Sequence, residues 1–377
     1  MSHILFPYIA QPHQEFHSLP IALEMSRLYP EIQVHIASLT PERDGRIRIL
    51  SQLYPKSSVT FDILEMPDWA RRHIALHGPT PLTKIMVLFL NRNYFRRFQA
   101  IVVPERTSLY LRKMGVHEPR LIWTRHGAGD RAIGFASDVR KFDYMLMAGR
   151  KIEERMQQAG VLRKGHYTTG VYAKFDLVRR LHAGHEALFP NERPTVVYNP
   201  HFSHSLSSWP RFGMKVLEYF ARQTKYNLIF APHYRLFDTN RQKSMERLAP
   251  FTGLPHMIID PGSDKSVDMT YTMAADLYMG DVSSQVGEFL IKPRPCLFLD
   301  AHGTQWQGNP NYESWTLGPV VDNLDTLGTT LDNAFLSHAN FLDRQKEYIG
   351  DTFGFAEPTE TAAKGAKSII DFLKPIG

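Results

Sequence analysis

Short runs of apolar residues recur along the chain and alternate with longer stretches whose apolar positions are three or four residues apart. A continuous apolar run of four to eight residues is typical of a buried strand, whereas the wider spacing is typical of an amphipathic helix. In the first half the runs predict strands at 4–9, 33–39, 59–64, 100–103, 121–124 and 144–147. In the second half they predict strands at 195–198, 227–231, 257–259, 277–279 and 295–299.

Helical patterns lie between these strands, for example at 19–28 and at 212–223. Strands that alternate with helices indicate βαβ units and therefore parallel sheets. The stretch 182–194 contains glycine, asparagine and two prolines, a composition typical of a linker. We therefore expect two α/β domains, at 1–182 and 195–360, and a C-terminal helix within 361–377 that packs back towards the first domain.

Composition narrows the class of protein. The longest apolar run, at 85–90, is much shorter than the roughly 20 residues of a membrane-spanning helix. The N-terminal residues lack the pattern of a secretion signal, so a cytoplasmic location is expected. The single cysteine, Cys296, lies in an apolar run, which indicates a buried structural thiol in a reducing compartment. The net charge of +6 suits phosphate-bearing ligands or an anionic membrane, and no nucleic-acid-binding motif is present.

The most informative motif spans residues 276–300, where a strand is followed by small polar residues, a predicted helix and a second strand. Ser283 and Ser284 would lie in the first turn of that helix, where free backbone N–H groups attract anions. Glu288 follows one turn later, a suitable place for contact with a ribose diol. The alternative is an ordinary helix cap formed by Asp281 or Ser283.

This motif resembles the signature of the CDP-glycerol glycerophosphotransferases, the teichoic-acid polymerase family. The resemblance includes the strand before it and the Lys-x-Pro strand after it, here Lys292 to Pro295. Further segments match the family in the same order, at 121–131, 196–202 and 228–235, with a weaker match at Gly170 and Asp176. The chain departs from the family at Val282, Tyr234 and the pair His201 and Phe202, and its first 110 residues match no known motif.

The resemblance implies the GT-B fold, an α/β architecture of two Rossmann-like parallel-sheet domains that face each other across a cleft. It also implies a nucleotide-activated donor such as CDP-glycerol in the second domain and an acceptor, a glycan or a lipid-linked molecule, in the first. The implied donor-binding residues are Asn199, Pro200, His201, Arg235, Asp281, Ser283, Ser284, Gln285 and Glu288. The implied acceptor-binding residues are Arg125, Gly127, Asp130 and Arg131.

The chemistry of such a transfer requires a base for the acceptor hydroxyl and positive groups for the diphosphate. By the resemblance, His126 is the base, while His233, as a second catalytic residue, and Arg235 would stabilise the diphosphate. The chain shows no Asp-x-Asp metal motif in a suitable loop and no zinc-binding histidine spacing, so no obligatory metal or cofactor is expected. A glycosyltransferase that uses a nucleotide sugar, a nucleotide-sugar epimerase and a non-catalytic nucleotide-binding module remain alternatives.

The segment 84–98 mixes apolar, aromatic and basic residues. Such a stretch is typical of a helix that lies at a membrane interface, with Lys84, Arg92, Arg96 and Arg97 near anionic lipid. The alternative is a domain helix with a solvated basic face. The first interpretation predicts a peripheral protein at the inner face of the cell membrane.

Overall fold

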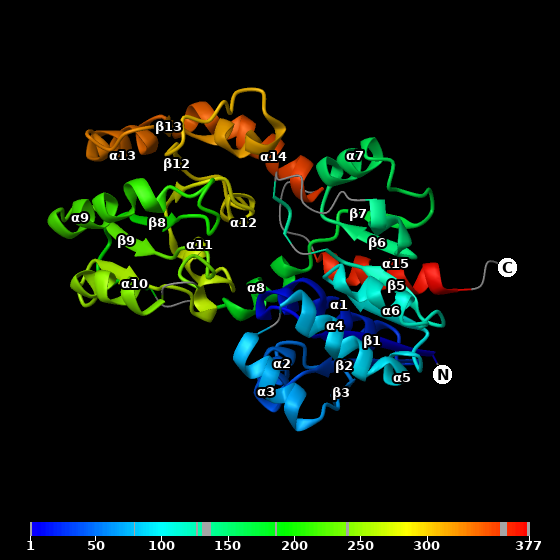
Figure 1. Cartoon of the computed structure of the whole chain (residues 1–377). Coiled ribbons are helices and arrows are strands. Elements are labelled where there is room, and N and C mark those ends of the chain that lie inside the picture. Colours follow the sequence, from blue (N-terminus) through cyan, green and yellow to red (C-terminus); the bar gives the residue numbers. More distant parts are fainter. Residues whose placement is uncertain are drawn as a thin grey trace. The chain divides into compact units, whose positions relative to one another are not determined.

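The computed structural model describes residues 2–78, 80–125, 127–129, 137–184, 187–238, 241–354 and 360–374. The chain forms two compact units, each built on its own parallel sheet (Figure 1). The first unit comprises Met1–His126, Ile133–Ala183 and Asp351–Gly377, and the second comprises Gly127–Ala132 and Gly184–Gly350.

The first unit contains a seven-stranded sheet with the order β3-β2-β1-β4-β5-β6-β7, in which every neighbouring pair is parallel. Its strands are β1 (Ser2–Tyr8), β2 (Ile32–Ser38), β3 (Val59–Ile63), β4 (Ala100–Val103), β5 (Arg120–Trp123), β6 (Tyr144–Met147) and β7 (Tyr167–Thr169). Its helices are α1 (Glu15–Leu28), α2 (Pro41–Ser51), α3 (Asp68–His77), α4 (Pro81–Leu90), α5 (Arg92–Phe95), α6 (Tyr110–Lys113), α7 (Arg150–Gln158), α8 (Lys174–Leu181) and α15 (Thr361–Leu373).

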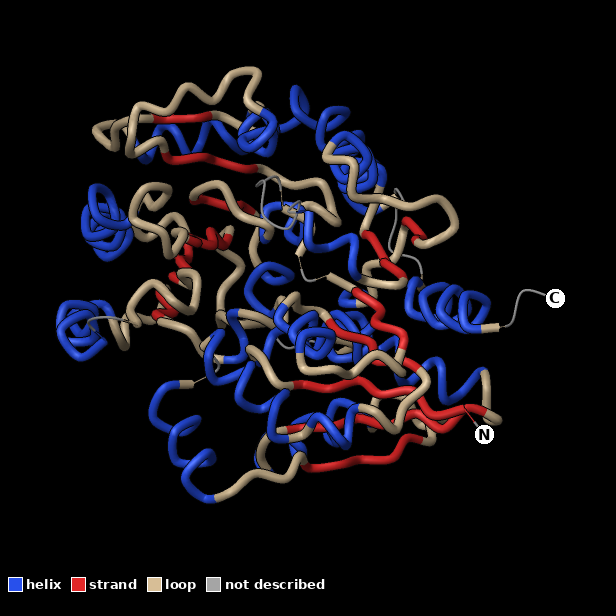
Figure 2. Tube along the Cα trace, turned by 45° about the vertical axis from the view of Figure 1, so that its right-hand side comes forward, coloured by secondary structure: helices blue, strands red, loops and turns tan. Residues whose placement is uncertain are grey.

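The second unit contains a six-stranded parallel sheet with the order β10-β9-β8-β11-β12-β13. Its strands are β8 (Thr195–Asn199), β9 (Asn227–Phe230), β10 (Met257–Ile259), β11 (Leu277–Gly280), β12 (Cys296–Leu299) and β13 (Val320–Val321). Its helices are α9 (Met214–Arg222), α10 (Arg241–Leu248), α11 (Thr270–Ala274), α12 (Gln285–Phe289) and α13 (Leu327–Leu336), and α14 (Leu342–Phe353) ends in the first unit. Helices flank the strands of both sheets (Figure 2).

Short 3₁₀ and π-helical elements complete the described chain. They are η1 (Pro12–Gln14), η2 (Thr107–Leu109), η3 (Ser137–Lys141), η4 (Trp209–Gly213), η5 (Ala249–Phe251), η6 (Asp264–Ser266), η7 (Pro310–Leu317) and η8 (His338–Phe341). Of these, η4 is a turn of π-helix and runs directly into α9. It accounts for the late start of the helix that the sequence pattern predicts from residue 212.

The hydrophobic pattern explains why these segments form strands. All strands predicted from the sequence are present, with small shifts at their ends. Most are apolar runs buried in a parallel sheet, whereas the edge strands β3 and β10 are only partly buried. Both helices that start at a threonine–proline pair are capped locally. Thr40 accepts a hydrogen bond from the backbone N–H of Arg43, and Thr80 accepts one from that of Thr83.

Each sheet has one place where the strand order reverses, between β1 and β4 in the first unit and between β8 and β11 in the second. Loops that leave the carboxyl ends of strands at such a reversal form the ligand-binding crevice in open α/β sheets. Each unit also has its own hydrophobic core under its own sheet. The fold therefore points to the carboxyl edge of each sheet as the place to look for a site.

Candidate functional site at the carboxyl ends of the strands

Polar side chains at the carboxyl ends of the strands of the second sheet form hydrogen bonds with the loops that follow. Asn199 ends β8, and Asp260, Asp281 and Asp300 follow β10, β11 and β12. Asp260 accepts hydrogen bonds from the backbone N–H groups of Gly262 and Ser263 at 2.9 and 2.7 Å. Asp300 accepts from those of His302 and Thr304 at 3.0 and 2.8 Å. After β10 and after β12, one carboxylate thus fixes the start of the following loop.

Asp281 organises the loop after β8. Its Oδ2 accepts hydrogen bonds from the backbone N–H groups of His201 at 2.7 Å and Ser208 at 2.9 Å. The carboxyl is fully buried, and burial raises its pKa to about 7. Its Oδ1 has no hydrogen-bond partner among the described residues. Since its side chain is enclosed, Asp281 acts by positioning the His201 loop, and the structure gives it no direct path to a ligand in solvent.

The strand end before Asp281 is fitted closely to β8. A β-carbon at Gly280 would lie 2.7 Å from the carbonyl oxygen of Asn199, closer than any side chain tolerates. The Asn199 amide donates to the Ala231 carbonyl at 2.6 Å, and the Tyr278 hydroxyl donates to the Asn199 side-chain oxygen at 3.3 Å. Asn199 is 2% exposed, so it also positions the loops after β8 and β9.

The loops after β8 and β9 bring His201, His233 and Arg235 together. The backbone N–H of His233 donates to the Pro200 carbonyl at 3.0 Å, and the two imidazole rings lie 5.8 Å apart between centroids. Phe202 stacks on His201 and lies 4.5 Å from the His233 ring. The exposed Arg235 guanidinium lies 4.7 Å above the Phe202 ring. Two imidazoles and a guanidinium therefore surround one aromatic ring at the carboxyl edge.

The Ser283–Ser284 segment has a different geometry from the predicted one. The helix begins only at Gln285, with Ser284 at its N-cap position, and is five residues long. Ser283 Oγ accepts a hydrogen bond from the Gln285 N–H at 3.2 Å, and Gln285 Nε2 donates to the Ser266 carbonyl at 3.4 Å. Because so few peptides align in this helix, its dipole contributes less than a longer helix would. Glu288 lies in the helix and is 4% exposed.

Two glycines of the segment 127–129 pack on Ser284 within the second unit. A β-carbon at Gly129 would lie 3.1 Å from Ser284 Cβ and 3.2 Å from its Cα. One at Gly127, where φ is +75°, would lie 3.5 Å from Ser284 Oγ. Glycine at these positions allows the backbone to approach the serine closely. The structure thereby brings Gly127, a predicted acceptor residue, together with Ser284, a predicted donor residue.

In the first unit, Arg125 follows β5 and has a left-handed backbone with φ of +56°. Its guanidinium lies 4.9 Å from the centroid of the Trp123 ring, and its NH1 lies 3.8 Å from the sulfur of Met156. Burial lowers the pKa of Arg125 to about 10, and the charges of Arg106 and Arg155 act in the same direction. The predicted residues His126, Asp130 and Arg131 lie outside the described residues.

The four basic residues predicted to contact a membrane differ in exposure. Lys84, on α4, is 8% exposed, so the expectation that it meets lipid is wrong: its side chain is packed inside the unit. Arg92 lies over the Phe89 ring at 4.6 Å, and Arg97 lies 5.4 Å from the Tyr94 ring. Arg96 is exposed and donates to the Gly115 carbonyl at 2.9 Å. The predicted single helix is divided into α4 and α5.

The sequence pattern did not single out Arg106 and Arg155. Arg106 lies three residues after β4, so the position rule for strand ends could have found it. Arg155 lies inside α7, where nothing in the local sequence distinguishes it from a solvated helix arginine. Both are recognised only because the fold places them near Arg125.

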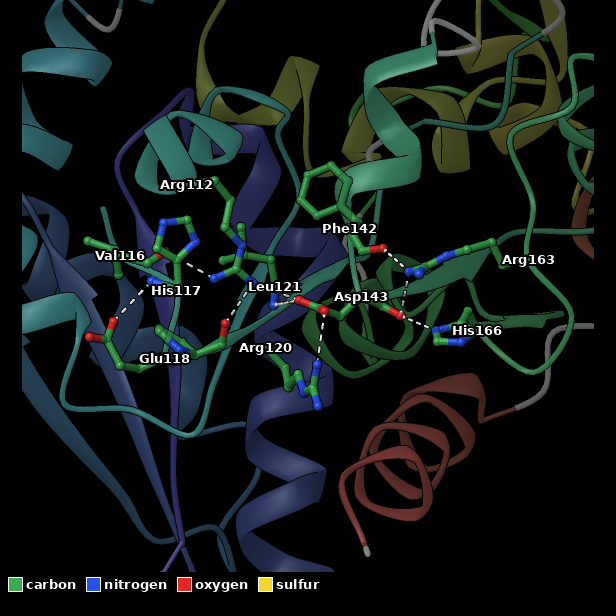
Figure 3. Close-up of polar contacts among 11 residues, drawn as sticks. Arg112, Val116, His117, Glu118, Arg120, Leu121, Phe142, Asp143, Arg163 and His166 are labelled. Carbon is green, nitrogen blue, oxygen red and sulfur yellow. Dashed lines mark hydrogen bonds and ion pairs between the residues drawn. The ribbon is translucent and has the colours of Figure 1, made fainter. Parts of the chain in front are cut away.

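The opposite, amino edge of the first sheet carries a contrasting basic cluster around Asp143 (Figure 3). Asp143 accepts from Arg112 at 2.7 Å and from the backbone N–H of Leu121 at 2.8 Å, and Arg120 lies 3.3 Å away. Arg163 donates to the Phe142 carbonyl at 2.8 Å. These arginines hold the starts of β5 and β6 in register, which is a structural role.

Two further findings concern metal ions and membranes. No group of three or more His, Cys, Asp or Glu side chains within the described ranges is arranged to hold a metal ion. None of the helices in the described part of the chain has the length and apolar character to span a membrane. Cys296 is buried in β12, and burial raises the pKa of its thiol, as the sequence predicts for a structural cysteine.

Comparison with known proteins gives a match at the level of structure. The sequence matches no protein-family model and no curated protein. The wall teichoic acid polymerase TagF, from a crystal soaked with CDPG, is similar with a TM-score of 0.64 at 14% identity, over 99% of this chain and 88% of that chain. A putative UDP-N-acetylglucosamine 2-epimerase from Listeria monocytogenes is similar with a TM-score of 0.62 at 11% identity, over 98% and 94% of the chains.

A third structure, the UDP-GlcNAc 2-epimerase from Neisseria meningitidis bound to UDP-GlcNAc, has a TM-score of 0.60 at 8% identity, over 99% of both chains. These similarities, with two Rossmann-like parallel sheets, identify the fold as GT-B, as the sequence predicts. At such low identities they define the fold and leave the reaction to be argued from the site.

Proposed function

We propose that this protein is a transferase that moves glycerol phosphate, or a related group, from a CDP-activated donor to a hydroxyl of a glycan, polymer or lipid acceptor. The donor's nucleotide binds at the carboxyl edge of the second sheet, beside Ser283 and Ser284. The observation that carries the proposal is the grouping of two imidazoles and a guanidinium around Phe202 at this edge, where the serine segment also follows a strand. The likeness of the fold to TagF with CDPG supports this donor class.

The proposed roles follow from the groups each loop presents. His233 and Arg235 meet the negative charge of the diphosphate, since both lie at the strand ends and Arg235 is exposed. His201, Pro200 and Asn199 shape the loop beside them, and Asp281 holds that loop in place. Gln285 and Glu288, next to the serines, complete the donor site.

His126 is the proposed base. The acceptor hydroxyl oxygen attacks the glycerol-bearing phosphorus and loses its proton to His126, while the bond to the CMP oxygen breaks and CMP leaves with that electron pair. Histidine suits this role because its ordinary pKa lies near neutrality. The next residue in the chain, Gly127, contacts Ser284. Arg125, Gly127, Asp130 and Arg131 are the proposed acceptor-binding residues around the base, and no metal or cofactor takes part.

A nucleotide-sugar donor is the second candidate. The similarity of the fold to two UDP-N-acetylglucosamine 2-epimerases favours it, because one of those structures holds UDP-GlcNAc. A glycosyltransferase or an epimerase would use the same carboxyl edge with a uridine nucleotide in place of a cytidine nucleotide. The nucleotide preference therefore decides between the two proposals.

The location is part of the proposal. We place the enzyme in the cytoplasm, peripherally at the inner face of the cell membrane, where a lipid-linked acceptor would be available. Exposed apolar side chains on α3 and α4, including Trp69, Leu76, Leu82 and Phe89, support a lipid contact. Arg92, Arg96 and Arg97 lie beside them in sequence and would meet anionic headgroups.

Calorimetric titration of the purified protein with CMP, CDP-glycerol, CDP-ribitol, UMP and UDP-GlcNAc tests the donor class. We expect the cytidine nucleotides to bind and Ser284→Ala to weaken their binding by about tenfold, the loss of one hydrogen bond to a charged phosphate. Ser244→Ala, on the partly exposed α10 of the same unit, is the matched control. Binding of uridine nucleotides alone would transfer the assignment to the second candidate. Equal binding by wild type and Ser284→Ala would remove the serine segment from the site.

A further inference from the structure

The connection between β12 and β13 in the second unit has an unusual composition. Parallel neighbours in a sheet are usually joined through an α-helix, but these two are joined by a loop at 300–309 and by η7. In a chain of which 22% of the residues are charged, the segment 301–312 contains no Asp, Glu, Lys or Arg. It contains instead two glutamines, two asparagines, a tryptophan and a tyrosine. We call it the amide–aromatic segment.

Hydrogen bonds hold the first half of this segment in place. Asp300 accepts from the backbone N–H groups of His302 and Thr304 at 3.0 and 2.8 Å. Arg211 NH1 donates to the Ala301 carbonyl at 3.1 Å, and His302 Nε2 donates to the Ser207 carbonyl at 3.1 Å. These contacts fix the segment against the chain that follows β8. A ligand that binds here therefore does not have to order the loop first, which favours its binding.

The aromatic side chains of the segment rest on one buried indole. Trp315 in η7 is 2% exposed and lies 6.2 Å from the Phe298 ring of β12, between ring centroids. The Tyr312 ring lies 5.0 Å from Trp315 and the Trp306 ring 6.2 Å, both in edge-to-face geometry. The Asn309 N–H donates to the Trp306 carbonyl at 3.0 Å and so closes the turn between the two. Trp306 and Tyr312 are partly exposed, so each keeps part of its ring available to solvent.

The charged residues at the two ends of the segment are engaged with the protein itself. Asp300 holds the loop, as described above. Glu313 accepts from Arg344 NH2 at 2.7 Å, and Arg344 Nε donates to the Thr316 hydroxyl at 3.3 Å. The bordering charges are thus used for local structure, and the segment between them offers neutral groups.

A neutral sugar fits these groups best. A phosphate or another ionic ligand would find no opposite charge within the segment, and a lipid chain would find no Leu, Ile, Val or Met there. The C–H groups of a sugar ring pack against the face of an aromatic ring, which is apolar and electron-rich. Its hydroxyls both donate and accept hydrogen bonds, and so does a side-chain amide. The exposed amides of Gln305 and Gln307 lie on either side of Trp306 in the chain.

We propose that the amide–aromatic segment binds a neutral oligosaccharide, with sugar rings packed on Trp306 and Tyr312 and hydroxyls bonded to Gln305 and Gln307. The inference goes beyond the proposed function, because it concerns a part of the second unit to which no donor or acceptor residue is assigned. It gives the protein a contact with uncharged sugar residues of a glycan.

Calorimetric titration of the full chain with maltoheptaose, cellopentaose and chitotetraose tests the proposal without any nucleotide. We expect binding of at least one of them, and Trp306→Ala to weaken it by about tenfold, because the stacking surface is lost. The double variant Gln305→Ala, Gln307→Ala changes only exposed side chains, so the fold is kept, and it should weaken binding by roughly fivefold. Absence of binding by all three sugars at millimolar concentration overturns the proposal. Unchanged affinity in the double variant does so as well.

Matched controls separate this segment from exposed side chains in general. Tyr110→Ala removes an aromatic ring that is 38% exposed on α6, and Gln242→Ala removes an exposed amide on α10. Both should bind the oligosaccharide as the wild type does. A loss in either control equal to the loss in Trp306→Ala contradicts a specific site. Tetragalacturonate, an anionic oligosaccharide, should bind more weakly than the neutral sugars, and tighter binding of it would contradict the neutral class.

Competition with nucleotides distinguishes this segment from the donor site. We expect the oligosaccharide affinity to be the same with and without saturating CMP or UDP-GlcNAc. If UDP-GlcNAc competes and UMP does not, the segment belongs to the pocket for the donor's sugar, and the proposal of a separate glycan site is wrong. Loss of nucleotide binding by wild type would contradict only the proposed donor, since the sugar titration contains no nucleotide.

Discussion

At the scale of single residues, the candidate site separates into side chains that hold loops and side chains that could meet a ligand. Asp281 and Asn199 belong to the first kind, because both are buried and each forms hydrogen bonds to the backbone of neighbouring loops. Arg235 and the serine segment belong to the second, because they are at least partly exposed at the same edge. The two kinds make different predictions, one about stability and the other about turnover.

Asp281 should make the stability of the second unit depend on pH. Its folded pKa of about 7 lies above the usual value of an aspartate, so the folded protein binds its proton more tightly than the unfolded chain does. The folded state then holds more protons between pH ~4 and ~7, and the free energy of unfolding falls as pH rises through that range. Above pH ~7 this contribution levels off.

Asp281→Asn removes this titration. We expect urea unfolding at pH 5, 6, 7 and 8 to show that the free energy of unfolding declines less steeply with pH for the variant than for wild type. The decline that remains in the variant includes the contribution of Asp176, a buried carboxyl with a pKa also raised to about 7. At pH 5 the wild-type carboxyl is protonated and neutral, like the amide of the variant, so the two stabilities should be similar there. Parallel pH profiles for the two proteins would contradict the assignment of the raised pKa to this group.

His126 carries the residue-scale prediction for catalysis. His126→Ala should lower turnover by about 100-fold or more, because a positioned base contributes 10²- to 10⁴-fold. Nucleotide affinity should stay unchanged, since the donor residues lie on other loops. Initial rates and calorimetry on the same preparation check both halves of the prediction. Near wild-type turnover would remove His126 as the base and leave the nucleotide site standing.

At the scale of elements, the sequence predicts strands much better than it predicts helix ends or side-chain environments. Buried parallel strands are continuous apolar runs, and such runs are visible without any tertiary information. The sequence pattern missed β7 and β13, because β7 is a three-residue run with two threonines and β13 has only two residues. Both are edge strands, with one neighbour each.

At the candidate site, too, the sequence predicts the positions of strands and loops but not the helix ends or the side-chain environments. The strand ends locate the loops at 199–202, 231–235 and 281–285 correctly, since loop position follows from strand position. The short α12 could not be foreseen, because the helix start depends on the turn that Ser283 forms with Gln285. Burial of Lys84 could not be foreseen either, since an amphipathic pattern does not fix which basic residue faces the core. The electrostatic effect of Arg106 and Arg155 on Arg125 is visible only in the folded structure.

The exposed sides of α3 and α4 support a prediction about membranes at the same scale. Replacing Arg92, Arg96 and Arg97 together by glutamine should reduce co-sedimentation with anionic vesicles, by roughly 1 kcal/mol of binding free energy per charge at low salt. Added salt should reduce wild-type binding in the same direction. Lys346→Gln on α14 is the control for total charge, since that exposed lysine belongs to the second unit.

The variants Leu82→Ser and Phe89→Ser distinguish insertion of apolar side chains into the bilayer from electrostatic attraction to its headgroups. Both side chains are more than half exposed, at 69% and 51%, so their loss should weaken vesicle binding without unfolding the helix. Binding that depends on the arginines but not on these residues would indicate a purely electrostatic contact. If wild-type protein does not sediment with anionic vesicles even at low salt, α3 and α4 are ordinary domain helices.

At the scale of the whole molecule, the chain returns to its first unit after completing the second. The helix α15 lies along α1 in the first unit, where it is drawn red in Figure 1. Its start is held by hydrogen bonds: the Ala362 N–H donates to Asp176 at 2.6 Å, and Thr361 Oγ1 accepts from the Tyr172 N–H at 3.0 Å. Lys364 donates to the Thr169 carbonyl at 2.6 Å. The C-terminal segment is therefore an integral part of the first unit's fold.

Deleting residues 355–377 should consequently destabilise the first unit selectively. The deletion removes Ala362, Ala366, Ile369 and Ile370, all at most 5% exposed, and leaves the buried Asp176 without the backbone donor that now satisfies it. Loss of several buried aliphatic side chains costs several kcal/mol, enough to unfold a domain of ordinary stability. The second unit keeps its own core and its nucleotide-binding loops, so it should remain folded.

Hydrogen exchange followed by mass spectrometry distinguishes the two units peptide by peptide. We expect protection to be lost in peptides from β1 to β7 and retained in those from β8 to β12. The conservative variant Lys364→Gln, which removes a single exposed hydrogen bond at the same helix, should leave both patterns intact. Equal loss of protection in both units would show that they unfold as one, and full protection in both would show that α15 adds little to the first unit.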